Sequence, residues 1–316
     1  MTLERRRTRA APTVETQPAD RLRHTMTGVR LSFSWFGLRR SLTPGQKTQA
    51  AEALDAAGDV LAASKKLLDT KHPAFQAVAA VKHQATSYWK AITLPFPEPG
   101  LRLIRQADIE PFHTKLTELS SELADAVTEL DRAYPELQAA AAERLGQLYQ
   151  PTDYPRSLRE EFALMWEFPA VEPPEYLRRL SPELYERECQ RVTAQFNEAV
   201  ALAEQAFCEE FGGLVSHLTE RLAGDADGHP KVFRDSAVTN LRTFFDRFRT
   251  LNVGSNAELE SLVDQAQQLL RGVAPQDLRA SDALRSRIRE QLGEVQTALE
   301  PLIVDRPRRN ILRRPR

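Results

Sequence analysis

Two long stretches of the sequence carry apolar residues at alternating steps of three and four, the pattern of a helix with one buried face. They predict helices over 107–149 and 182–223. Ser181 and Pro182 would open the second helix as an N-cap and a first helical residue, and Gly224 would end it. The apolar positions are Ile109, Phe112, Leu116, Leu119, Leu123, Val127, Leu130 and Tyr134 in the first stretch, and Val192, Phe196, Val200, Ala203, Phe207, Phe211, Leu214, Leu218 and Leu222 in the second.

These two helices are each expected to be unusually long. A helix of about 40 residues spans about 60 Å, and it needs a partner along its length to bury its apolar face. The other long helix is the obvious partner, so we predict an antiparallel hairpin of coiled-coil type. Pro135 lies inside the first helix and should kink or interrupt it at Tyr134, because proline lacks the N–H group and clashes with the preceding turn.

Shorter patterns fill the rest of the chain. Apolar and polar residues alternate from Val29 to Trp35, which predicts a half-buried strand, and a second short strand over 101–104 is expected to pair with it. No period of 20 to 50 residues recurs, which disfavours a repeat solenoid. Further helices are expected over 43–68, 73–92, 158–165, 234–251, 256–270 and 282–302.

The predicted fold class is therefore mainly all-α: an elongated antiparallel helical bundle or coiled-coil hairpin with a small two-stranded β patch near the N-terminus. The predicted organisation is a disordered basic tail over 1–27, a helical body over 28–305 and a basic tail over 306–316. Since helical hairpins add length without a second core, the body could be one domain or two.

The net charge of −1 hides an uneven distribution. Residues 1–24 carry six arginines against three acidic residues, and residues 306–316 carry six arginines and no acid, so the segment between them has a net charge of −10. Clustered cations bind phosphate backbones through counterion release, and they also bind acidic partners. The candidate contacts to nucleic acid or an acidic partner are Arg5, Arg6, Arg7, Arg9, Arg306, Arg308, Arg309, Arg313, Arg314 and Arg316.

No motif for chemistry stands out. Glu110 and His113 have the Glu-x-x-His spacing of a carboxylate-bridged metal site, but a second copy is missing. Phosphate-binding glycine loops and the Gly-x-Ser-x-Gly nucleophile turn are absent, and the carboxylates suit solvated helix faces. We therefore expect no catalytic, metal-binding or cofactor-binding residue and no enzyme activity.

The cysteines and the hydropathy favour a cytoplasmic protein. Cys189 and Cys208 would lie about 28 Å apart in one helix, so they cannot form a disulfide with each other and are expected to be packing residues. No apolar run approaches the roughly 18 residues of a membrane helix, and no hydrophobic stretch follows the basic start of the chain. We predict no membrane partner.

The start of the chain resembles an uncharacterised family of helical proteins encoded by bacteria and their phages. The pattern is Val29-x-x-Ser32-x-Ser34-Trp35-x-Gly37-x-x-Arg40-x-Leu42, followed by Ser64-Lys65-Lys66 with Asp69, Pro95 to Gly100, and Asp108 to Tyr134. Thr70 and Leu38 depart from the family pattern. Relatives of this kind resemble parts of gene clusters with MoxR-type AAA+ ATPases, which implies an adaptor, substrate or scaffold for an ATPase and gives no catalytic residues.

Three functional hypotheses follow. The preferred one is a non-enzymatic scaffold or adaptor that binds other proteins, with a MoxR-type ATPase as a candidate partner. The alternative is a nucleic-acid-associated protein that uses the arginine-rich tails. An enzyme with a site inside the bundle ranks last. The aromatic residues Trp35, Phe36 and Trp166 are a candidate surface for early mutation, although core packing explains them better.

Overall fold

The computed structural model describes residues 17–53, 55, 60, 62–223 and 235–304, and these divide into two compact units. The sheet unit comprises the described residues of Thr27–Thr93 together with Gly100–Pro169. The helical unit comprises the described residues of 1–26, Leu94–Pro99 and the described residues of 170–316. Each unit has its own buried core.

The first unit combines a helical hairpin with strands. Its elements are β1 (Met26–Ser34), β2 (Arg39–Ser41), α2 (Pro44–Glu52), β3 (Ser64–Lys66), α3 (Pro73–Ala91), β4 (Thr93–Pro95), β5 (Leu101–Arg105), η1 (Gln106–Asp108), α4 (Ile109–Leu145), η2 (Gly146–Leu148), η3 (Pro151–Asp153) and β6 (Ala163–Glu167). The division between the units falls within two of these strands, because Met26 of β1 and Leu94–Pro95 of β4 belong to the helical unit. Four strands run in the order β4-β5-β1-β6, and β1 is antiparallel to β6 with Leu31 opposite Trp166. The other two strands form a separate antiparallel pair, β2-β3.

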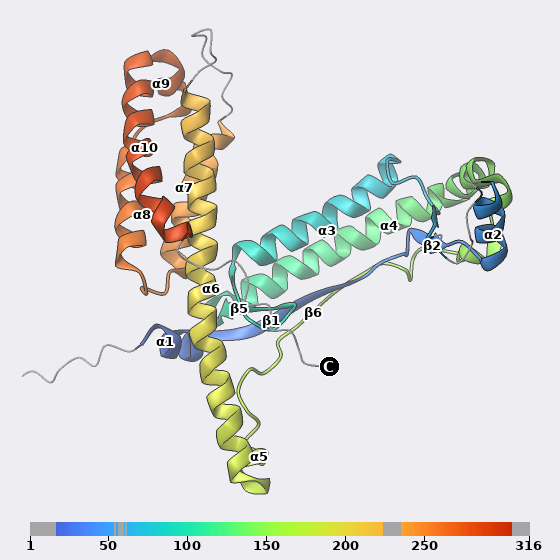
Figure 1. Ribbon diagram of the computed structural model, residues 1–316, viewed down its shortest axis with the longest axis horizontal. Coiled ribbons are helices and arrows are strands. Elements are labelled where there is room, and N and C mark those ends of the chain that lie inside the picture. Colours follow the sequence, from blue (N-terminus) through green and yellow to red (C-terminus); the bar gives the residue numbers. More distant parts are fainter. Residues whose placement is uncertain (1–16, 54, 56–59, 61, 224–234, 305–316) are drawn as a thin grey trace, which may run out of the picture. The chain divides into compact units, whose positions relative to one another are not determined.

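Helices α3 and α4 pack side by side, and α4 also contacts β6 (Figure 1). The predicted apolar face of α4 is its buried face: Phe112, Leu116 and Leu130 are fully buried in the core of the sheet unit. This confirms the first long helix. Pro135 does not interrupt it, because α4 is continuous from Ile109 to Leu145.

Several predictions for this unit are wrong. The helix expected over 43–68 ends at Glu52, and residues 64–66 form strand β3, not part of a helix. The helix expected over 158–165 is replaced by β6, in which Leu164 is buried while Met165 and Glu167 are exposed. That alternation is the period of a strand, and it gives β1 a second neighbour beside β5. The sheet is therefore four-stranded, larger than the two-stranded patch that was predicted.

The helical unit contains α1 (Pro18–Thr25), α5 (Tyr176–Leu180), α6 (Pro182–Leu222), α7 (Ser236–Leu251), α8 (Ala257–Leu269), α9 (Pro275–Ala280) and α10 (Asp282–Val304). The N-cap of α6 is Ser181, as predicted, and its hydroxyl accepts a hydrogen bond from the Leu184 amide at 3.4 Å. Phenylalanines from α6 and α7 form the core, where Phe211 and Phe244 stack with ring centroids 5.2 Å apart.

The coiled-coil hairpin of the two long helices is not confirmed. The apolar face of α4 is covered by α3 in the sheet unit, and that of α6 by α10, α7 and α1 in the helical unit. Several shorter helices placed in succession bury a long helix as completely as one partner of equal length would. Residues 1–27 were expected to form a disordered tail, but Pro18–Thr25 form helix α1. This helix is held in the helical unit because Leu22 is buried, at 2% exposure.

Candidate functional site

The residues that the sequence singled out do not assemble into one site. The ten arginines of the two tails, from Arg5 to Arg9 and from Arg306 to Arg316, lie outside the described residues, so they stay a prediction. His113 is exposed on α4, where its Nδ1 accepts a hydrogen bond from the Trp166 indole N–H at 3.2 Å. Within the described ranges, no group of three or more His, Cys, Asp or Glu side chains could hold a metal ion.

The aromatic group of Trp35, Phe36 and Trp166 serves packing. Phe36 is buried at 2% exposure, and Trp35 makes an edge-to-face contact with Phe162 at a centroid distance of 4.8 Å. The ammonium group of Lys82 lies 4.2 Å from the Trp35 ring centroid, within the range of a cation–π interaction. These contacts occupy the rings, so the group is a poor docking surface.

Lys65, from the Ser-Lys-Lys motif, is a buried cation. Its side chain is 1% exposed, and its Nζ lies 2.6 Å from Asp153 Oδ2 and donates to the Leu148 carbonyl at 2.6 Å. The Asp153 contact is an ion pair without a well-directed hydrogen bond, because no hydrogen bond reaches that buried oxygen. Lys65 thereby joins β3 to the segment that follows α4, which is a structural role.

Exposed apolar side chains lie away from the long helices. In the part of the chain that the structure describes, none of the exposed large apolar residues belongs to α4 or α6. Two of them share α5: Tyr176 is 54% exposed and Leu180 is 77% exposed. Since they are four residues apart, they lie on one face of that helix. We call this pair the α5 surface. The exposed large apolar residues are Val60, Met165, Phe168, Tyr176 and Leu180.

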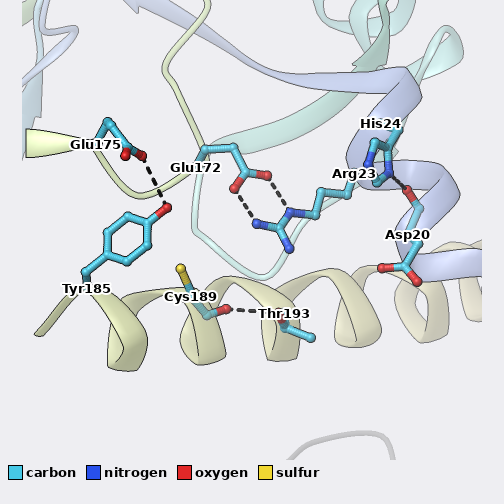
Figure 2. Close-up of polar contacts among 8 residues, drawn as sticks. All are labelled: Asp20, Arg23, His24, Glu172, Glu175, Tyr185, Cys189 and Thr193. Carbon is cyan, nitrogen blue, oxygen red and sulfur yellow. Dashed lines mark hydrogen bonds and ion pairs between the residues drawn. The ribbon is translucent and has the colours of Figure 1, made fainter. Parts of the chain in front are cut away.

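Polar contacts fasten the α5 segment to two neighbouring helices, as Figure 2 shows. Arg23 of α1 donates two parallel hydrogen bonds of 2.6 Å each to Glu172, from Nε and Nη2 to the two carboxylate oxygens. The Tyr185 hydroxyl on α6 donates to Glu175, the residue before α5, over 3.4 Å. A two-pronged guanidinium–carboxylate pair fixes direction as well as distance, so the chain entering α5 is held in place.

The contacts in this cluster raise the pKa values of Arg23 and Tyr185. The hydrogen bonds from Arg23 to Glu172 raise the pKa of the arginine above its ordinary value. The pKa of Tyr185 is also raised, first by its hydrogen bond with the Cys189 side chain and then by the negative charge of Glu175. The hydroxyl therefore keeps its proton and remains a donor. Cys189 lies one turn further along α6, where its carbonyl accepts from the Thr193 hydroxyl at 2.9 Å (Figure 2). The arrangement positions α5.

Sequence reasoning missed the α5 surface. Its signal was present, because Tyr176 and Leu180 stand among charged residues just after a proline pair at 173–174. Five residues are too few for a helical period to be recognised, and exposure is a property of the fold.

The comparisons leave the family open. No family model matches the chain, and neither a curated protein nor a solved structure does. The resemblance to phage and bacterial helical proteins therefore stays a prediction. Of the helices that the structure describes, none combines the length and the apolar character needed to cross a membrane.

Proposed function

We propose that the chain is a non-enzymatic scaffold that binds other proteins through the α5 surface. The observation that carries the proposal is the exposure of Leu180 and Tyr176, at 77% and 54%, on one face of a helix. Burying a leucine side chain is worth about 1.5–3 kcal/mol, and tyrosine is enriched among the residues that dominate interface energies. A partner that covers both side chains would recover this free energy.

The attachment of α5 supports the proposal. Ordering a loop on binding costs free energy that is lost from affinity. The Arg23–Glu172 pair and the Tyr185–Glu175 hydrogen bond order the segment before any partner arrives. The α5 surface is therefore prepared for docking, with its contact residues on a helix and its supporting residues beneath them.

A MoxR-type AAA+ ATPase is the partner that the family resemblance implies. The α5 surface would fit any partner with an apolar patch, so the identity of the partner rests on that resemblance alone. A nucleic-acid partner would instead need cations, and α5 carries two exposed arginines: Arg178, which forms an ion pair of 3.4 Å with Glu175, and Arg179. The α5 surface itself, Tyr176 and Leu180, is apolar, and we therefore favour a protein partner for it.

The test is a pull-down of tagged full-length chain from the cells that produce it, with and without nuclease, read by mass spectrometry. Leu180→Ser and Tyr176→Ser remove the apolar contact. Met165→Ser is the matched control, because Met165 is 48% exposed on the sheet unit. We expect a defined set of proteins that survives nuclease and the control variant, and that is lost with the α5 variants. Capture that is indifferent to the α5 variants would refute the proposal.

The nucleic-acid alternative is tested by the same experiment. Partners lost on nuclease treatment would favour it, as would a salt-sensitive affinity that disappears when residues 1–16 and 305–316 are removed. The N-terminal cut should stop at residue 16, because Leu22 is buried and Arg21 donates to the Val253 carbonyl at 2.5 Å. A longer deletion would damage the helical unit and mimic a loss of binding.

A further inference from the structure

A hollow of about 880 Å³ lies between α7, α8 and the turn that follows α8. Three of its lining residues are arginines, and we call it the arginine groove. Its floor includes Phe245 and Leu270, each only 2% exposed, whereas the arginines at its rim are exposed. The groove residues are Arg242, Phe245, Asp246, Arg249, Asp264, Gln267, Gln268, Leu270, Arg271 and Gly272.

The positions of the arginines follow from helix geometry. Arg242 and Arg249 are seven residues apart, which is about two turns, so both lie on the same face of α7. Arg271 joins them from the turn after α8, where Gly272 adopts a positive φ of 74°. That backbone conformation is easily reached by glycine and bends the chain back along the groove.

The three arginines share the groove with two carboxylates, Asp246 and Asp264, so the lining carries an excess of one positive charge. Arg242 donates to the Val273 carbonyl at 2.6 Å, and Arg249 donates to the Gln267 side-chain oxygen at 2.5 Å, so both use neutral acceptors. Over the stretches that the structure describes, Arg271 makes no side-chain hydrogen bond or ion pair, and no ion pair joins the three arginines to Asp246 or Asp264. Three guanidinium groups in one hollow repel one another, and an anionic ligand would relieve that repulsion.

The remaining lining narrows the class of ligand. Gln267 and Gln268 can each donate and accept, and the carboxylates of Asp246 and Asp264 accept only. A peptide main chain supplies both donors and acceptors to such groups, while acidic side chains supply carboxylates to the arginines. Enclosed, mainly apolar pockets are typical of small-molecule sites, and this groove is open with exposed cations.

We infer that the arginine groove binds an acidic peptide segment of a protein partner. This inference rests on the proposed function as a protein-binding scaffold, but it uses a surface separate from α5. The groove supplies charge and hydrogen bonds, whereas the α5 surface supplies apolar contact. The two surfaces of the helical unit would then recognise different features of a partner.

The test uses the full chain and a fluorescein-labelled peptide of alternating Glu and Ala, followed by fluorescence anisotropy. A peptide with Gln in place of Glu is the neutral control. We expect binding of the acidic peptide that weakens with added salt, and about a fivefold loss of affinity with Arg271→Gln, as for the loss of one exposed charge contact. Arg271→Gln breaks no side-chain hydrogen bond or ion pair within the described residues, so it should not disturb folding. Arg289→Gln, on the exposed face of α10, removes the same charge outside the groove and should leave affinity unchanged.

Three results would overturn the inference. One is equal binding by the chain and by a variant that combines Arg242→Gln, Arg249→Gln and Arg271→Gln, with unchanged circular dichroism. Another is equal binding of the neutral peptide. The last is tight binding of inorganic phosphate or a single-stranded oligonucleotide without binding of the acidic peptide. Leu180→Ser should not change peptide affinity, so a failure here leaves the Leu180-dependent capture of partners as a separate result.

Discussion

Replacing Lys65 by methionine tests whether a buried ion pair holds the sheet unit together. The ammonium group is 1% exposed and has two partners at 2.6 Å, the Asp153 carboxylate and the Leu148 carbonyl. Lys65→Met keeps an unbranched side chain, shorter by the ammonium group, and leaves both acceptors without their cation. Because the Asp153 side chain is only 17% exposed, water can solvate it only in part.

The expected cost is about 2–4 kcal/mol of unfolding free energy. Breaking a buried pair by removing one partner costs about 3–5 kcal/mol, and the partial exposure of Asp153 lowers that figure. With a urea dependence of about 1–3 kcal/mol per molar, the midpoint of unfolding should fall by roughly 1–2 M. The double variant Lys65→Met with Asp153→Asn should lose less than the sum of the two single variants, because it leaves no unpaired charge.

Tryptophan fluorescence is a selective probe for this measurement. All three tryptophans of the chain, Trp35, Trp89 and Trp166, belong to the sheet unit. Their emission reports the unfolding of that unit, while far-ultraviolet circular dichroism reports the helices of both units. The fluorescence transition also gives the free energy of unfolding of the sheet unit. A value for Lys65→Met within about 0.5 kcal/mol of the parent would contradict a stabilising buried ion pair, since surface substitutions have effects of that size.

Three further predictions concern stability and reactivity. Burial raises the pKa of Asp131, but hydrogen bonds from the Leu158 amide and its neighbours outweigh that effect and lower it overall; Asp131→Asn should therefore cost about 1–2 kcal/mol at pH 7. A carboxylate with a lowered folded-state pKa stabilises the fold above its ordinary pKa of about 3.9, and this contribution is lost as the pH falls through the folded-state pKa. The urea midpoints of the parent and of Asp131→Asn should therefore converge in acid. A constant difference between the two midpoints would contradict the lowered pKa. Phe244→Ala should destabilise the helical unit by about 3–5 kcal/mol, because Phe244 is 1% exposed and packs against other rings; the circular dichroism transition should shift while the tryptophan transition stays, and a joint shift would show that the units unfold together. A thiol reagent should label Cys189 in the native chain and reach Cys208, at 3% exposure, only in denaturant; rapid labelling of both would contradict the packing of α6.

The long helices and their buried faces could be predicted from the sequence, because apolar spacing over ten turns is a strong local signal. The cap at Ser181 could also be predicted, and its side chain accepts a hydrogen bond from the backbone amide three residues on. The pairing of β5 beside β1 was also predicted and is confirmed.

The choice of partner for each helix could not be predicted. The apolar face of α4 does not encode whether α3 or another helix will cover it, since both present similar apolar stripes. Short strands such as β3 and β6 were missed because three to five residues do not distinguish a strand from a helical turn, and their pairing is settled by residues far along the chain.

The candidate surfaces were harder still. Arg242 and Arg249 have a readable spacing on one helix face, but Arg271 joins them only through the turn after α8. The exposure of Leu180 depends on how the segment from Glu172 to Glu175 is fastened to α1 and α6, and a sequence pattern does not carry that information. Electrostatic and exposed sites of this kind emerge from tertiary structure.

The most direct test of the central claim is a quantitative pull-down that compares the full chain with its Leu180→Ser and Met165→Ser variants after nuclease treatment. We expect the same proteins to be recovered with the parent and with Met165→Ser, and to be lost with Leu180→Ser. Equal recovery with all three chains, or recovery that depends on nucleic acid, would contradict a protein-binding scaffold that uses the α5 surface.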